Sequence, residues 1–246
     1  MTRKIYLTII WSICLLVILF SCGIRFAGWF TFGTNKAALS DTVSVKEYDN
    51  LKMELGFGDI SFATSKDDSF FVEYETSSER YAPQVKVTGD TLYISQKKIK
   101  NLNVTGNKLS VTVYTPKGYK LGNVHIEAGA GDVDVDNISA KKLDMDFGAG
   151  DVKVVNSTIP TISVDVGAGD VVFADNTFEK IDIDAGTGDV KISGVGDIDQ
   201  YDYDIDMGVG DVEIGGNKFH GEYEVSGTTD KKISVDCGVG DLDVSE

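Results

Sequence analysis

Residues 143–154 read LDMDFGAGDVKV, and this phrase decides how the chain folds. Apolar side chains alternate with polar ones as far as a Gly-x-Gly-Asp sequence, and the alternation resumes after it. A period of two is typical of a β-strand that buries one face. The phrase therefore predicts two short strands that place their apolar side chains in a common core.

The two strands must be joined by a corner, because the alternation changes phase between them. Met145 and Phe147 share one parity, whereas Val152 and Val154 share the other. A strand cannot change faces without a bend, and glycine tolerates the positive φ that such a bend requires. We therefore expect the corner at Gly150.

The phrase recurs six times between Val124 and Glu246, each time closing on an aspartate. These corner aspartates are Asp132, Asp151, Asp170, Asp189, Asp211 and Asp241. The first four are nineteen residues apart, and insertions of three and eleven residues precede the last two. A fixed period near twenty indicates a repeat array, in which stacked repeats bury a continuous core that one repeat cannot form. The predicted fold is all-β, a β-helix-like solenoid of rungs about 19 residues long.

Stacking of this kind aligns equivalent outward residues in columns. One acidic column is predicted to contain Glu127, Asp146, Asp165, Asp184, Asp206 and Asp236. The corner aspartates form a second, and outward glycines such as Gly148 lie between the two. A second corner in each repeat is indicated by residues that tolerate left-handed backbone, namely Asn137, Asn156, Asn176, Gly194 and Gly216-Asn217. Cys237 lies at an inward position equivalent to Phe147, which predicts a small buried apolar residue.

The N-terminal part of the chain predicts a membrane anchor. Residues 5–24 are uncharged and mostly apolar, and twenty helical residues span about 30 Å, the thickness of a bilayer core. Arg3 and Lys4 favour a cytoplasmic tail at residues 1–4, which places the remainder outside the cell membrane as a single-pass protein. A cleaved signal is the alternative, because residues 19–22 resemble a lipobox that would make Cys22 a lipidated residue.

The rest of the chain divides into three parts. Residues 25–40 form a linker, residues 41–122 predict irregular β rungs, and residues 123–246 contain the regular repeats. Residues 51–62, LKMELGFGDISF, are a further complete copy of the phrase within the irregular part.

Negative charge is concentrated in the regular repeats. Residues 41–122 contain eleven basic and eleven acidic side chains, whereas residues 123–246 contain eight basic and twenty-eight acidic ones. Nucleic acid and anionic lipid are therefore unsuitable partners for the array. A partner for such a surface is expected to be a cell-surface protein or glycan.

Residues 109–157, which run from LSVTVYTPKGYKLGNV to the second Gly-Asp repeat, resemble a known family. They are similar to the bacterial adhesin-like β-strand-repeat proteins, a cell-surface domain family of unknown function. The resemblance extends over roughly residues 48–246. It implies a surface solenoid with an adhesive role, and it assigns no catalytic or binding residue.

The acidic columns suggest a calcium site. Neighbouring unit charges about 4.8 Å apart in water repel by about 0.9 kcal/mol, and Ca²⁺, which prefers oxygen ligands, could bridge them. The candidate ligands are Asp132, Asp151, Asp170, Asp189, Asp211, Asp241, Asp146, Asp165 and Asp184. The alternative is that the corner carboxylates accept hydrogen bonds from turn backbone and that the other column is a solvated face. No organic cofactor is expected.

The two insertions provide the candidate ligand contacts. Loops that interrupt a solenoid often provide its function, and here they contain Tyr201, His220 and Tyr223. A bulge or hairpin explains the same residues without a ligand.

An enzyme is not expected. The sequence contains two histidines, His125 and His220, and no His-Glu-x-x-His, Cys-x-x-Cys or nucleophile-elbow motif. Three hypotheses follow: a membrane-anchored surface adhesin or scaffold, a sensory or accessory protein of the cell envelope, and a calcium-stabilised array.

Overall fold

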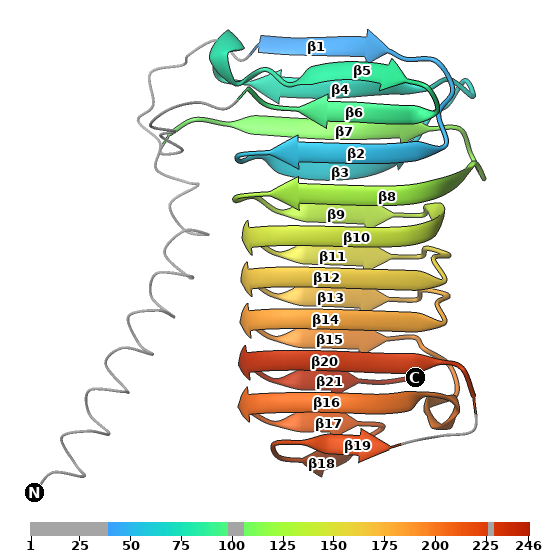
Figure 1. Cartoon of the computed structure of the whole chain (residues 1–246), viewed down its shortest axis with the longest axis vertical. Coiled ribbons are helices and arrows are strands. Elements are labelled where there is room, and N and C mark those ends of the chain that lie inside the picture. Colours follow the sequence, from blue (N-terminus) through green and yellow to red (C-terminus); the bar gives the residue numbers. More distant parts are fainter. Residues whose placement is uncertain (1–38, 98–105, 226–228) are drawn as a thin grey trace, which may run out of the picture. The chain divides into compact units, whose positions relative to one another are not determined.

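The computed structural model describes residues 39–97, 106–225 and 229–246. In these ranges two long β-sheets lie face to face (Figure 1), accompanied by the 3-10 helices η1 (Glu79–Tyr81) and η2 (Ile198–Gln200). The predicted tail and membrane segment lie outside the described residues. No helix within the described ranges is both long and apolar enough to cross a membrane.

The two sheets are here named A and B. In spatial order, sheet A contains β1 (Leu39–Ser44), β4 (Phe71–Thr76), β7 (Leu109–Thr115), β3 (Asp59–Thr64), β9 (Val133–Asp136), β11 (Val152–Val155), β13 (Val171–Ala174), β15 (Val190–Ser193), β21 (Leu242–Val244), β17 (Val212–Ile214) and β18 (Asn217–Phe219). Sheet B contains β5 (Gln84–Thr88), β6 (Thr91–Ser95), β2 (Asn50–Leu55), β8 (Lys120–Ala128), β10 (Ser139–Ala149), β12 (Thr161–Ala168), β14 (Lys180–Thr187), β20 (Lys232–Val239), β16 (Asp202–Val209) and β19 (Tyr223–Val225).

Each copy of the phrase forms one rung, meaning a strand in sheet B joined at a Gly-Asp corner to a strand in sheet A. Consecutive rungs pair in parallel and in the same register: Met145 lies opposite Val164 in sheet B, and Val152 lies opposite Val171 in sheet A. The predicted all-β, solenoid-like fold is confirmed.

The core lies between the two sheets and consists of the inward side chains of every rung. Phe147, Phe173 and Cys237 are all 1% exposed or less, which confirms the inward position predicted for Cys237. Because apolar burial contributes about 25 cal/mol per Å², the shared core stabilises rungs that are too small to fold alone.

The Gly-Asp corner permits the backbones of neighbouring rungs to approach closely. Gly150 has a φ of 143°, and a Cβ built on it would lie 1.9 Å from the carbonyl oxygen of Gly131. Gly169 repeats this geometry over Gly150, with φ of 148° and 2.0 Å. A larger residue would therefore push the neighbouring rungs apart. This explains why glycine recurs at this position in every repeat.

The second corner follows the prediction with one correction. Asn137 and Asn156 have the expected positive φ, but in the next rung the left-handed residue is Asp175 and not Asn176. Asn176 is buried instead, where its Nδ2 donates to the carbonyl of Val154 and its Oδ1 accepts from the N–H of Ser157. The amide thus links two rungs from inside the corner.

The rungs are not stacked in sequence order, contrary to the expectation. The rung β20–β21 lies between β14–β15 and β16–β17 (Figure 1). Asp241 is accordingly hydrogen-bonded to both Asp189 and Asp211. The same occurs near the other end, where β2 pairs with both β6 and β8, and β3 with both β7 and β9. At each end, two rungs that are neighbours in space are separated in the sequence by a rung that lies farther out in the stack.

Antiparallel strands cover both ends of the stack. At one end β5 pairs with β6, β4 pairs with β7, and β1 pairs with β4. At the other end β18 pairs with β17, and β19 pairs with β16. The residues of both sequence insertions therefore gather at this second end, where they form the cap.

Replacing Gly169 with alanine should lower the free energy of unfolding by about 3 kcal/mol or more, because positive φ and a backbone clash oppose any Cβ there. Denaturant unfolding of residues 39–246 measures the change. The neighbouring Ala168, which is exposed, provides the matched control: Ala168→Ser should alter stability by about 0.5 kcal/mol or less. Equal effects of the two substitutions would show that the rungs do not approach closely at Gly169.

Amide hydrogen exchange should test the order of the rungs. Since β20 is bonded to a strand on each side, the amides of Val235 and Cys237 should be as protected as that of Val164 in the middle of the stack. The amides of the edge strand β19 should exchange much faster. If β20 exchanged as rapidly as β19, the interior position of this rung would be wrong.

Candidate functional site

The outward face of sheet B presents a continuous column of carboxylates, here called the outer acidic column. In spatial order it contains Glu54, Glu127, Asp146, Asp165, Asp184, Asp236 and Asp206. Each lies directly opposite the next across a parallel ladder. The column therefore contains all the predicted residues. Glu54 joins it at one end, and at the other end Asp236 precedes Asp206.

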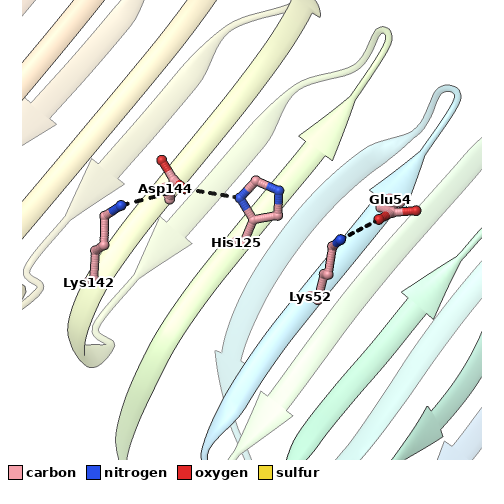
Figure 2. A network of polar contacts seen from close by, with 5 residues as sticks. All are labelled: Lys52, Glu54, His125, Lys142 and Asp144. Carbon is pink, nitrogen blue, oxygen red and sulfur yellow. Dashed lines mark hydrogen bonds and ion pairs between the residues drawn. The ribbon is translucent and has the colours of Figure 1, made fainter.

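Basic side chains accompany the acidic face mainly at one end. Figure 2 shows Lys52 paired with Glu54 at 2.8 Å, and Asp144 paired with both His125 at 3.2 Å and Lys142 at 3.6 Å. The His125–Asp144 contact connects β8 with β10, whereas the other two pairs each lie within a single strand, β2 or β10. All of the groups are substantially exposed, so each pair contributes little to stability.

Over the next four rungs the outer face becomes a shallow acidic hollow. Its lining includes Ser163, Asp165, Asp182, Asp184, Asp204, Asp206, Ser234 and Asp236. Lys232 lies 2.6 Å from Asp204, and this hydrogen bond raises the pKa of the Lys232 ammonium group. Among the described residues, no basic side chain forms an ion pair with Asp165, Asp184, Asp206 or Asp236.

The corner aspartates form a hydrogen-bonded corner ladder. The N–H of Asp151 donates to Oδ1 of Asp132, and the N–H of Asp170 donates to Oδ1 of Asp151, each at 3.0 Å. The ladder continues through Asp189, Asp241 and Asp211 and begins at Asp59. Each of these carboxylates except that of Asp211 therefore accepts a hydrogen bond from the backbone of the neighbouring rung. This is the structural role that the sequence offered as the alternative to calcium binding.

The predicted glycine strip lies between the column and the ladder. Gly129, Gly148 and Gly167 follow one another there, and each of their positions would bring a Cβ within 2.6 Å of a neighbouring carbonyl oxygen. At the β6 end Gln96 closes the strip, because its Oε1 accepts from the N–H of Gly56 at 2.8 Å. Sequence reasoning missed Gln96, since it lies outside the repeating phrase.

Tyr201 and Tyr223, two of the predicted ligand contacts, lie together in the cap. They line a small hollow with Ile198, Asp199, Tyr203, Ile214, Asn217, Phe219 and Val225, here called the cap hollow. Tyr201 is only 4% exposed, and burial raises the pKa of its phenol. Tyr203 donates to the carbonyl of Ile198 at 2.9 Å, so its hydroxyl is engaged within the cap.

His220, the third predicted contact, does not line the cap hollow. Its Nδ1 lies 3.1 Å from Oδ1 of Asp211, the last member of the corner ladder, and its side chain is 76% exposed. Tyr203 and Phe219 were missed as lining residues. The inward parity of Tyr203 indicated core. Phe219 of β18 contacts Tyr223 of β19, with ring centroids 4.1 Å apart, only once these two strands have paired with β17 and β16.

The described residues include no group of three or more His, Cys, Asp or Glu side chains placed to hold a metal ion. The outer column keeps its neighbours one strand apart, and the corner ladder already uses one oxygen of each carboxylate. What this surface offers chemically is a flat array of negative charge beside exposed backbone, together with a small aromatic hollow at one end.

Among solved structures, a candidate cell adhesion protein from Clostridium sporogenes is similar, with 17% identity and a TM-score of 0.55, covering 85% of this chain and 99% of that one. A candidate adhesin from Parabacteroides distasonis has 16% identity and a TM-score of 0.45 over 85% of this chain and 98% of that one. At these identities the first comparison shows the fold alone.

No curated protein matches the sequence. The family model described as Toastrack DUF4097 matches residues 48–236, which include every rung of the stack except the end of β20 and the whole of β21. The chain therefore belongs to the Toastrack DUF4097 family.

Proposed function

We propose that this chain is a membrane-anchored, extracytoplasmic adhesin or scaffold of the bacterial cell surface, without enzymatic activity. The outer acidic column is the observation that supports a binding role best. It places seven carboxylates in register on one rigid face, and within the described ranges Asp165, Asp184, Asp236 and Asp206 face solvent without an ion pair. The similar protein from Clostridium sporogenes, named for cell adhesion, supports the same proposal.

The partner that fits this face is a cell-surface protein or glycan with positive charge. Aligned carboxylates create a negative potential that attracts cationic groups and repels nucleic acid and anionic lipid. Because the face is flat and its backbone is exposed along the glycine strip, an extended partner could lie along several rungs. Such binding relies on long-range charge and should weaken as salt concentration rises.

Neutralising the face should abolish binding. In the variant D165N/D184N/D206N/D236N, retention of bacterial cells on beads coated with residues 39–246 should fall at least tenfold in low salt. The matched control, D134N/D136N/D243N/E213Q, removes the same charge from sheet A, where Asp134 and Asp136 face outward. It should retain cells nearly as well as the unmodified protein. A similar loss in both variants would indicate net charge alone, and no loss in either would contradict the proposed face.

Anchoring is proposed through residues 5–24, which lie outside the described residues. In intact cells the protein should remain in the membrane fraction, and a membrane-impermeant amine reagent should label it through exposed lysines such as Lys153 and Lys191. A Cys22→Ser variant separates the two anchors: the protein stays in the membrane if residues 5–24 span it, and is released if Cys22 is lipidated. Absence of labelling in intact cells would contradict the extracytoplasmic location.

Calcium is proposed only for the outer acidic column, where Asp165, Asp184 and Asp236 form no ion pair with any other described side chain. Millimolar Ca²⁺ should then raise the thermal midpoint of residues 39–246 relative to EDTA, because the ion would offset repulsion between neighbouring carboxylates. The variant D165N/D184N/D206N/D236N should show no such rise. An equal response to Mg²⁺ would indicate general screening and not a calcium site.

A further inference from the structure

The rung β20–β21 occupies a slot that earlier parts of the chain have already outlined. We define the slot as the space between β14–β15 on one side and β16–β17 on the other. Ile183 of β14 and Ile205 of β16 both lie opposite Val235, and Asp189 and Asp211 are both bonded to Asp241. The rung therefore enters between two neighbours that precede it in sequence.

The connection between the slot's two walls has the length that this arrangement requires. Five residues, 156–160, join β11 to β12 on adjacent rungs, and five more, 175–179, join β13 to β14. Eight residues, 194–201, join β15 to β16, which lie two rungs apart. The three additional residues thus give this connection the length needed to pass one intervening rung.

An empty slot would leave many backbone groups without partners. The amides of Gly188 and Val190 donate to the carbonyls of Val239 and Asp241. The amides of Gly240 and Leu242 donate to backbone carbonyls of the rung β16–β17, on the other side of the slot. Unpaired buried backbone groups are costly, so the walls must accept a rung or close upon each other. What fits is narrowly defined: a Cβ at Gly238 would lie 2.6 Å from the carbonyl oxygen of Gly186, and one at Gly240 would lie 1.9 Å from that of Gly188.

We propose that the slot accepts the rung β20–β21 of a second copy of this chain, so that two molecules can exchange this rung. Every copy contains a segment that satisfies the slot on both edges, with glycine at both close approaches and an aspartate that continues the corner ladder. The rungs β10–β11 and β12–β13 are joined to both spatial neighbours by short connections, whereas β20–β21 follows the cap strands β18 and β19 in sequence. Exchange of an identical element is a known route to dimers that requires no new contact.

Disulfide trapping tests the exchange in the full chain, purified in mild detergent with Cys14 and Cys22 replaced by serine and the buried Cys237 replaced by alanine. Asp182 of β14 lies opposite Ser234 of β20, with both side chains directed outward. One preparation carries Asp182→Cys and another carries Ser234→Cys, and the two are mixed, unfolded and refolded together. If the rung of one chain enters the slot of the other, a disulfide between the two chains should form efficiently, because neighbouring strand positions meet the distance that a disulfide requires.

The matched control uses the same substitutions on rungs adjacent in both sequence and space. Asp144 of β10 lies opposite Ser163 of β12, so a mixture of Asp144→Cys and Ser163→Cys chains reports random collision of exposed thiols. The slot pair should give at least tenfold more crosslinked dimer on non-reducing electrophoresis, and the yield should rise with protein concentration.

A single chain with both Asp182→Cys and Ser234→Cys checks the geometry itself and should close an internal disulfide at high dilution. Equal yields from the slot pair and the control pair would overturn the exchange. Failure of the double variant to close would overturn the slot arrangement on which the exchange depends.

Discussion

The close contact between stacked Gly-Asp corners is the constraint on which the rest of the structure depends. Glycine at positions such as Gly150 allows the backbone of one rung to lie against the carbonyl of the next. The aspartate that follows donates its N–H to the carboxylate of its neighbour, which aligns the rungs at one point. Alignment at the corner then determines the register of both sheets, and register determines which side chains form the core and which form the surface columns.

Much of this could be predicted from the phrase itself. The alternation around Phe147 identifies the inward residues, and the change of phase at Gly150 identifies the corner, since both follow from strand geometry. The outer acidic column follows from the same parity. Asn176 was assigned wrongly because asparagine tolerates left-handed backbone, yet here the neighbouring Asp175 adopts that conformation and the amide is buried.

The order of the rungs could not be predicted in this way, because every repeat presents nearly the same edges to its neighbours. The period of the sequence predicts that the rungs stack, but it does not determine which rung lies next to which. The signals were the unequal connections, above all the three extra residues before Asp211, and their meaning becomes clear only when the displaced rung is seen between β14 and β16. For the candidate site, likewise, the sequence identified Tyr201 and Tyr223 in separate insertions but did not show that both belong to one cap.

The out-of-order rungs alter how the molecule would respond to mechanical load. In a simple solenoid, tension on the two ends of the chain peels the terminal rungs away one at a time, and each step breaks only one interface. Here β2–β3 and β20–β21 are each enclosed by rungs on both sides. Tension transmitted through them must shear two parallel ladders in each sheet together, so the force is shared by many hydrogen bonds at once. Such an array should therefore resist an applied force better than a stack whose terminal rungs separate one at a time.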